Sequence, residues 1–579
     1  MKILVINLTR MGDLIQSTPL LKSIKQANPG SEIVLMVNSR FSAICSRMPF
    51  VDRVIKFDVE KTGKNIVDAQ KSLIESYHEI ESLVCSLNNE KFNKIYNLTH
   101  SKMSALLTTM ITVDEINGIC VDSKGFRVIK NQWMVYFFNA AINRYFNPFN
   151  LVDMYLLSGR SGNSERKLSL DITEDDRRDA LLFYEESDLK KDDILIGMQP
   201  GASKSHKQWP VEFFASLARM FSEKLNVKIA LFGSEQEKPI GEEIENISGV
   251  KVINTMGKTT VQNLSAFVSR CSVLITNDTG TMHVATAAGV KVIEISVGPV
   301  NFWETGPYGD GHAVIQTSIV CAPCGFNVSC LNEICKKTIV PEEVFLLTEE
   351  MLGLKGINDV RDSGKFLNSN VYKTVFDECG FLDFYPLIYR KIDENIFWRQ
   401  IYRGFWKSII KDVAGEQEGR EVFEKISGRY DVSGVGHFSH SLKSTADAIS
   451  KIEILASEGE GLVKKIVDLL SSSSTGKHHT HISELARKVS LIDVSIEEIA
   501  SITRQLSPVC DVYRMKRESI DSDDPAKVAW TYLALYRELR KYCLSLKNIL
   551  RPFIDYHGCM SSGFSCSGSN GVLQDVGKI

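Results

Sequence analysis

The sequence lacks the long hydrophobic segment of a membrane-spanning protein. Its longest apolar run, Trp133–Ile142, has ten residues and is interrupted by Asn139, whereas a helix needs about 20 apolar residues to cross a bilayer. The first residues, MKILVINLTRMGD, contain no signal-peptide core. We therefore expect a cytoplasmic protein without a membrane span.

The chain also lacks a charge excess of either sign. Its 68 basic and 71 acidic residues leave a net charge of −3, which gives no basic surface for nucleic acid and no polybasic membrane anchor. Hydrophobic residues make up 44% and charged residues 24% of the chain, so a disordered or fibrous protein is excluded. At roughly 100–200 residues per domain, 579 residues predict three or four domains.

A disulfide framework is absent as well, because the thirteen cysteines are an odd number and no secretion signal precedes them. Nine cysteines are scattered and are interpreted as buried thiols. Four thiolates that lie within fifteen residues can close a tetrahedral site on zinc or iron, and the alternative is a loop of reduced thiols. These four are Cys321, Cys324, Cys330 and Cys335.

What the chain does have is an alternation of strands and helices over its first three fifths. Near-continuous apolar runs separated by helical spacing, as at Lys2–Leu8 and Glu32–Asn38, indicate a parallel sheet covered on both faces. We predict two Rossmann-like domains, at residues 1–160 and 161–356. A ligand would lie between them, outside the carboxyl ends of the strands.

After about residue 356 the pattern becomes helical, so an all-α region is predicted at 357–555 and a flexible tail at 556–579. Asp524-Pro525 is a strong helix start, and we expect that helix to end before Pro552. A row of apolar side chains at 3-4 spacing must be buried, either against the other helices or against a protein partner or second copy. The row consists of Ile482, Leu485, Val489, Ile492, Ile496, Ile499 and Leu506.

Asp13 is a candidate catalytic residue at the end of the first strand. Gly12 allows a tight turn there and leaves Asp13 at the carboxyl edge of the sheet, where a carboxylate can take a proton from a substrate hydroxyl. The alternative interpretation is an aspartate that caps the following helix.

Two segments of the second half are candidates for binding an anion. Lys207 follows the Gly201 turn closely and can grip a phosphate as a mobile charge, although it can equally be a solvated loop lysine. The segment Thr276–His283 leaves a strand and opens a helix, so it presents backbone N–H groups and the positive end of a helix dipole. The alternatives are that Asp278 or Thr279 only caps this helix and that His283 belongs to the core.

Together these segments resemble glycosyltransferase family 9, the heptosyltransferases of lipopolysaccharide core assembly. The resemblance covers residues 1 to about 350, and its motifs occur in the family's order. They are Arg10-Met11-Gly12-Asp13 with Thr18-Pro19, Pro200-Gly201-Ala202 with Lys207-Gln208-Trp209-Pro210, Asn277-Asp278-Thr279-Gly280 with His283, and Gly306-Pro307-Tyr308-Gly309. One departure lies after Gly298-Pro299, where Val300-Asn301-Phe302 replaces the Thr-Asp-Pro that lies near the donor sugar in the family.

The resemblance implies a GT-B architecture of two Rossmann-like domains, inversion at the anomeric carbon and no catalytic metal. It assigns the general base to Asp13. It also implies the residues that bind the nucleotide-sugar donor: Lys207 at the phosphates, Asp278, Thr279 and Gly280 at the diphosphate with His283 close by, Glu237 at the ribose, and Met256 at the adenine. In one branch of the family four cysteines hold iron, which implies structural zinc or iron at the cysteine cluster.

The resemblance leads us to expect transfer of heptose from ADP-heptose to a lipopolysaccharide core acceptor, by a cytoplasmic enzyme or one peripheral at the inner membrane. A protein acceptor, such as an adhesin or a flagellin, is the alternative that the additional helical region favours. A third reading is an inactive, transferase-like interaction protein. The intact motifs at Asp13, Lys207 and Asp278 argue against that reading.

Overall fold

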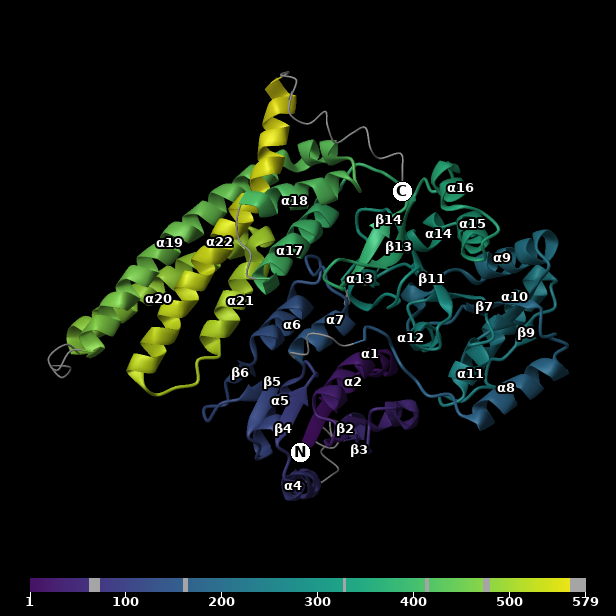
Figure 1. Ribbon diagram of the computed structural model, residues 1–579, viewed down its shortest axis with the longest axis horizontal. Coiled ribbons are helices and arrows are strands. Elements are labelled where there is room, and N and C mark those ends of the chain that lie inside the picture. The colour runs from purple at the N-terminus through teal and green to yellow at the C-terminus, as the bar shows by residue number, and fades with distance from the viewer. Residues whose placement is uncertain (62–72, 160–164, 326–329, 412–415, 472–478, 563–579) are drawn as a thin grey trace. The chain divides into compact units, whose positions relative to one another are not determined.

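The computed structural model describes the chain in two compact units (Figure 1). Unit 1 comprises Met1–Asn117 and Phe149–Ile388, and unit 2 comprises Gly118–Pro148 and Tyr389–Ile579. No helix among the described residues is long and apolar enough to cross a membrane. The described residues are 1–61, 73–159, 165–325, 330–411, 416–471 and 479–562.

The first sheet is built around β1 (Lys2–Asn7), which pairs in parallel with β2 and β4. Four consecutive side chains of β1, Ile3–Ile6, are fully buried, as expected for a strand covered on both faces. The strand order is β3-β2-β1-β4-β5-β6. The other strands are β2 (Glu32–Asn38), β3 (Arg53–Phe57), β4 (Lys94–Asn97), β5 (Glu115–Val121) and β6 (Arg127–Lys130).

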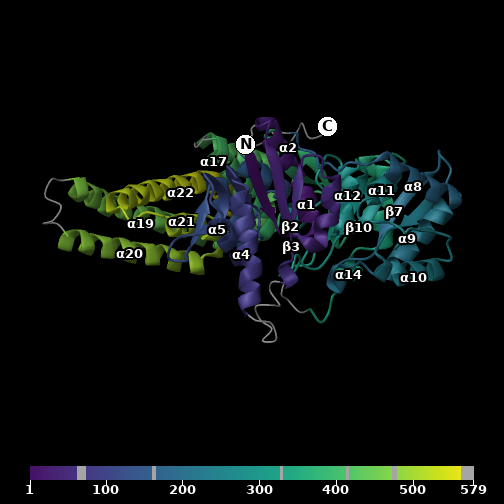
Figure 2. The ribbon, with the colours of Figure 1, turned by 90° about the horizontal axis from the view of Figure 1, so that it is seen from below.

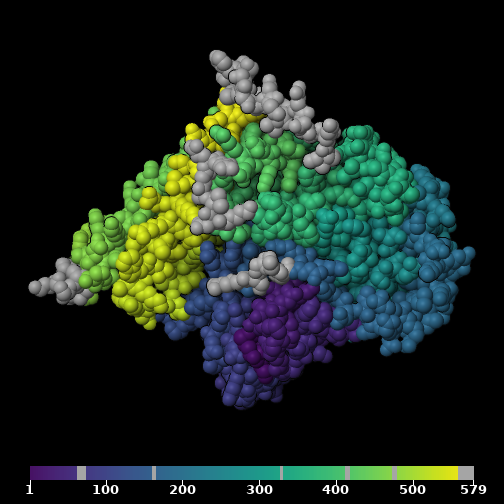
Figure 3. Space-filling model, in the orientation of Figure 1, coloured from purple at the N-terminus to yellow at the C-terminus, as the bar shows by residue number. Residues whose placement is uncertain are grey.

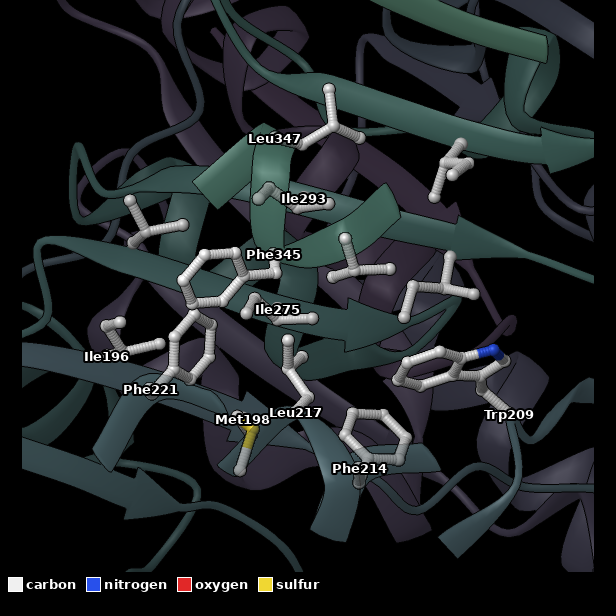
Figure 4. Packing of buried hydrophobic residues seen from close by; sticks show 14 of the residues in the cluster. Ile196, Met198, Trp209, Phe214, Leu217, Phe221, Ile275, Ile293, Phe345 and Leu347 are labelled. Atoms are coloured by element: carbon white, nitrogen blue, oxygen red, sulfur yellow. The ribbon is translucent and has the colours of Figure 1, made fainter. Parts of the chain in front are cut away.

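The second sheet has the order β14-β13-β12-β11-β10-β7-β8-β9. Figure 4 shows its core, in which Ile196, Ile275 and Ile293 of the strands lie against Phe221 of α9 and Phe345 of α15. The six strands β7–β12 are parallel. They are β7 (Ile194–Gln199), β8 (Val227–Leu231), β9 (Ile253–Asn254), β10 (Val273–Asn277), β11 (Lys291–Ser296) and β12 (Ala313–Thr317).

Helices and 3-10 turns connect these strands within unit 1. The helices are α1 (Met11–Gln16), α2 (Thr18–Ala27), α4 (Leu73–Asn89), α5 (Lys102–Met110), α7 (Leu151–Ser158), α8 (Glu174–Glu186), α9 (Val211–Lys224), α10 (Lys238–Ser248), α11 (Leu264–Val268), α12 (Gly280–Ala287), α13 (Phe302–Thr305), α14 (Cys335–Thr338), α15 (Pro341–Met351) and α16 (Ile357–Asp362). The 3-10 turns are η1 (Ser39–Arg47), η2 (Ser205–Lys207) and η3 (Glu235–Glu237).

Two antiparallel strands extend the second sheet beyond residue 356. The strands β13 (Ser369–Phe376) and β14 (Leu382–Pro386) form a hairpin, and β13 pairs with β12. The sequence analysis expected only helices there, and that detail was wrong. The sequence signal for the hairpin is the glycine at its turn. Gly380 has a φ of +75°, a value that glycine adopts without strain. The fold class itself is confirmed: two Rossmann-like sheets precede a long helical region.

Unit 2 consists mainly of long helices, of which α19 and α22 lie in contact (Figure 1). Figure 3 shows the yellow residues of the C-terminal helices beside green residues that precede them in the sequence. The apolar row predicted on α20 is largely buried in this unit, where α20 contacts α19 and α21. The helices are α6 (Gln132–Ile142), α17 (Glu394–Lys411), α18 (Glu416–Ser427), α19 (Ser439–Ser471), α20 (His479–Ile502), α21 (Ser507–Glu518) and α22 (Pro525–Ser562), with the 3-10 turns η4 (Val432–Phe438) and η6 (Arg504–Leu506).

Residues 118–148, which the sequence analysis assigns to the first domain, pack with the C-terminal helices of unit 2. Asn139 explains this association, because its Nδ2 donates a hydrogen bond of 2.8 Å to the carbonyl of Pro508. The one polar residue in the apolar run of α6 is thus a contact to α21. Arg399 and Arg403 of α17 donate to the carbonyls of Tyr145 (2.9 Å) and Pro148 (3.0 Å).

The helix α22 begins as predicted but does not end before Pro552. It continues to Ser562. Pro552 lacks the N–H that would bond the carbonyl of Asn548 within the helix. Gly419 lies against that carbonyl instead: a Cβ on Gly419 would be 2.2 Å from the carbonyl oxygen. The helix is also held beyond the proline by Phe553, which is fully buried.

A buried carboxylate joins α7 to distant segments of unit 1. Asp153 Oδ1 accepts hydrogen bonds from Arg166 Nη1 (2.6 Å) and Tyr308 Oη (2.8 Å), and its Oδ2 accepts one from the N–H of Leu382 (2.9 Å). These contacts tie the Gly306–Gly309 motif and β14 to a single side chain. We expect them to hold the crossover between the two Rossmann-like domains in place.

Replacing Asp153 should therefore destabilise the protein strongly. Asp153→Ala should lower the free energy of unfolding by about 3–5 kcal/mol, because it leaves the Arg166 guanidinium without its buried partner. The control is Asp175→Ala, which removes a surface ion pair with Arg178 (2.8 Å) and should cost less than about 1 kcal/mol. Urea unfolding of both variants measures the difference, and equal losses would contradict this assignment.

Candidate functional site

The carboxyl group of Asp13 lies at the end of β1, on the third residue of α1. The N-cap of this helix is Arg10, whose backbone N–H donates to Asp13 Oδ2 at 3.2 Å. Burial raises the pKa of Asp13, the charge of Glu304 acts in the same direction, and the Arg10 N–H opposes both. Asp13 is thus more basic than an aspartate in water, which suits a group that accepts a proton.

The helices α1 and α12 meet at two glycines, and this contact joins the two Rossmann-like domains inside unit 1. A Cβ on Gly12 would lie 2.8 Å from Cδ2 of His283, and a Cβ on Gly280 would overlap the methyl group of Met11. Glycine is required at position 12, where the His283 ring lies close, whereas the atom near Gly280 is the end of the flexible Met11 side chain. The structure therefore brings the motif of Asp13 together with the segment Asp278–His283.

His283 is buried in this contact, with 4% of its surface exposed. Burial lowers its pKa to about 4, although the charge of Asp278 acts in the opposite direction, so the imidazole is neutral near pH 7. Its Nδ1 has no hydrogen-bond partner among the described residues. The side chain therefore lies between the two domains as a neutral, polar group.

Lys207 and Asp278 form an ion pair, with 2.5 Å between Nζ and Oδ2. The side chain of Lys207 is only 10% exposed, so Lys207 is not a solvated loop lysine. Thr279 is the N-cap of α12, and its side chain makes no capping hydrogen bond in the described structure. The Thr279 side chain therefore does not occupy the first N–H groups of α12, which follow Asp278, the partner of the Lys207 ammonium group.

Asn277 connects the two motifs of the second domain, and the sequence analysis gave it no role of its own. Its Nδ2 donates to the carbonyl of Pro200 (2.8 Å), while its Oδ1 accepts from the N–H of Trp209 (3.0 Å). Both ends of the loop that carries Lys207 are therefore fixed to the last residue of β10. This clamp sets the position of Lys207 relative to α12.

Glu237 and Met256 lie together at the carboxyl ends of β8 and β9. A Cβ on Gly233 would be 3.2 Å from both Glu237 Oε2 and Met256 Cγ. A Cβ on Gly201 would overlap Glu237 Oε1, so the loop after β7 reaches the same place. Glu237 Oε2 accepts hydrogen bonds from the N–H (2.7 Å) and Oγ (2.9 Å) of Ser234. The structure thus groups the predicted ribose and adenine residues near one another.

Glu294 is a buried acid that the sequence analysis missed. It lies in β11 opposite Thr276 of β10, is fully buried, and has no hydrogen-bond partner for either carboxyl oxygen among the described residues. Burial raises its pKa well above the usual range, Asp278 acts in the same direction, and Lys207 opposes both. The signal for it was a single acid within the apolar strand KVIEIS.

The four clustered cysteines lie close enough to raise the pKa values of one another's thiols. Burial is the main cause that raises the pKa of the Cys324 thiol. The charges of Cys335, Cys321 and Cys330 raise it further. The N–H of Cys324 donates to the carbonyl of Gly298 at 3.2 Å. Within the described ranges, which leave out 326–329, no group of three or more possible ligands is placed to hold a metal ion. A structural zinc or iron there stays a prediction.

Comparisons with known proteins agree with the motifs. Residues 80–334 match the model of glycosyltransferase family 9 (heptosyltransferase), which confirms the family resemblance. A lipooligosaccharide heptosyltransferase 2 of Campylobacter jejuni is 34% identical over 163 residues, or 27% of this chain and 51% of that protein, so this chain spans about half the length of that relative. One of the same name from Haemophilus influenzae is 24% identical over 324 residues, covering 55% of this chain and 88% of that protein.

Two solved structures are similar to this chain. A glycosyltransferase of family 9 from Veillonella parvula is 24% identical, covers 61% of this chain and 98% of its own, and has a TM-score of 0.49. The ADP-heptose lipopolysaccharide heptosyltransferase II of E. coli is 21% identical, covers 61% of this chain and 99% of its own, and has a TM-score of 0.45.

The raised pKa of Glu294 predicts a characteristic pH dependence of stability. Above about pH 4.5 an unfolded chain loses the glutamate proton while the folded chain keeps it, so stability falls with rising pH until the folded carboxyl ionises. Glu294→Gln removes this loss, at most about 1.4 kcal/mol per pH unit. Its melting temperature relative to wild type should rise between pH 5 and 8. The exposed control Glu242→Gln should follow wild type at every pH, and a constant difference for Glu294→Gln would contradict the burial argument.

Proposed function

Because residues 80–334 form a glycosyltransferase family 9 domain, we propose that this protein is an inverting heptosyltransferase. It moves heptose from ADP-heptose to a lipopolysaccharide core acceptor. The names of its relatives support the donor and the acceptor. The observation that carries the proposal is the convergence of Asp13, the Lys207–Asp278 pair and the uncapped start of α12.

The start of α12 and Lys207 suit a leaving diphosphate. Negative charge grows on the β-phosphate as the glycosidic bond breaks, and N–H groups and an ammonium group that are already in place stabilise it without reorganisation. Asn277 fixes the loop of Lys207 through Pro200 and Trp209. The pair with Asp278 keeps the ammonium beside the helix start before the donor arrives.

Asp13 is the general base in this proposal. Its raised pKa makes it a stronger acceptor for the proton of the attacking hydroxyl. It lies in α1, next to the contact with α12, so that its carboxylate approaches the donor site from the opposite domain. In-line attack opposite the leaving diphosphate then inverts the anomeric carbon.

Glu237 and Met256 complete the donor site in this proposal. Glu237 offers carboxylate oxygens to the ribose hydroxyls, and the buried Met256 offers an apolar contact to the adenine. Soaking ADP into crystals, or following chemical shifts on ADP titration, would test whether the nucleotide occupies this end of the second sheet.

A protein acceptor is the second candidate, and unit 2 favours it. The family match ends at residue 334, and the helices from α17 onward lie beyond it. A transfer assay with ADP-heptose can offer either a heptose-free core lipid or an unfolded adhesin-type polypeptide. Mass spectrometry of both products identifies the acceptor, whereas hydrolysis of ADP-heptose without transfer to either would favour a different acceptor class.

Removing the buried lysine should weaken nucleotide binding. Lys207→Ala should reduce the affinity for ADP by roughly 1.5–3 kcal/mol, the range for a hydrogen bond to a charged group. The matched control is Lys204→Ala, since Lys204 is exposed in the same loop. Calorimetry measures both affinities. An unchanged affinity in Lys207→Ala would remove this residue from the donor site.

Removing the base should affect turnover alone. Asp13→Asn should lower the rate of transfer by at least ~100-fold, the usual contribution of a general base, while ADP still binds with wild-type affinity. Asp192→Asn, at an exposed position, serves as the control. If Asp13→Asn turns over at the rate of this control, Asp13 is not the base.

A further inference from the structure

The outer face of α20 carries a second row of side chains that no described residue covers. Figure 2 shows α20 at the edge of the helices of unit 2, with α19, α21 and α22 on one side of it. The inner row of α20, including Leu485, Val489 and Ile496, is buried. On the outer face Leu491 is 60% exposed and Val494 is 52% exposed. Two large apolar side chains one turn apart thus face outward.

Two opposite charges flank this apolar pair at helical spacing. Arg487 lies four residues before Leu491, and Glu498 lies four residues after Val494; both are exposed. The spacing of 4, 3 and 4 residues is that of the a and d positions of a coiled coil. The outer row is therefore a seam with a basic end, an apolar middle and an acidic end.

This seam is complementary to itself when two copies run antiparallel. In that arrangement Leu491 meets Val494 of the second copy, and Arg487 meets Glu498 of the second copy. The two-fold axis repeats each contact, so one seam forms two apolar contacts and two ion pairs. An isologous interface requires this kind of self-complementarity, and a parallel arrangement would place like charges together.

We propose that two copies of this chain associate through the outer faces of α20, antiparallel about a two-fold axis at the middle of the seam. The helix has 24 residues and is about 36 Å long, so the contact can extend well beyond the four seam residues. A cavity of about 400 Å³ adjoins the seam and is lined by Val494, Glu498, Ser501, Cys510 and Arg514. It provides a hole for Leu491 of the second copy.

Charge reversal tests the proposal on the full chain. Light scattering over a wide range of concentrations should give twice the mass of one chain for wild type. Arg487→Glu and Glu498→Arg should each weaken the dimer roughly 10-fold, because symmetry turns two weak attractions into two repulsions. The double variant R487E/E498R restores opposite charges across the seam and should restore the wild-type dissociation constant.

Two further variants keep the test specific. Leu491→Glu places charge in the apolar middle and should give a monomer. Lys527→Glu makes the same change in charge as Arg487→Glu at an exposed position on α22 and should leave the dimer intact. Circular dichroism verifies that each variant is folded. A chain that is monomeric at every concentration, or a dimer that both single reversals leave unchanged, overturns the proposal.

Discussion

The close approach of α1 and α12 is the constraint on which the candidate site depends. Each helix follows a central strand of its own sheet, and at their contact α1 presents Gly12 and α12 presents Gly280. The side chains that fill the space opposite are His283 and Met11. A larger residue at Gly12 would press on the ring of His283 and so separate the segment of Asp13 from that of Asp278.

Burial gives the charges around this contact their strength. Lys207 and Asp278 are largely removed from water, where an ion pair of 2.5 Å is poorly screened. Burial, together with the charge of Asp278, raises the pKa of Glu294 well above its usual range, while Lys207 opposes this shift. The second sheet thus brings together an ion pair and an acid whose pKa is raised.

The sequence predicts the parts of this structure that local patterns determine. Residues that are neighbours in the sequence determine the apolar strands, the Asp524-Pro525 helix start and the four family motifs. The β13–β14 hairpin and the passage of α22 through Pro552 depend on distant partners, such as β12 and Gly419. The same holds for the site: motif spacing predicts Asp13 and Lys207, but only tertiary packing shows that Asn277 clamps a loop and that Glu294 lacks a partner among the described residues.

The discontinuity of unit 2 has a consequence for how the chain reaches its folded state. During synthesis the apolar helix α6 emerges long before α17 and α21, whose residues it packs against. Until those helices are made, Trp133–Ile142 exposes one of the most apolar segments of the chain. The N-terminal part of the chain therefore leaves the ribosome with an exposed apolar surface, which the C-terminal helices cover later. We expect chaperones to bind this segment, and any fragment that ends near Ile388 to be insoluble. Both follow because the fold pairs an early segment of the chain with helices that are synthesised late.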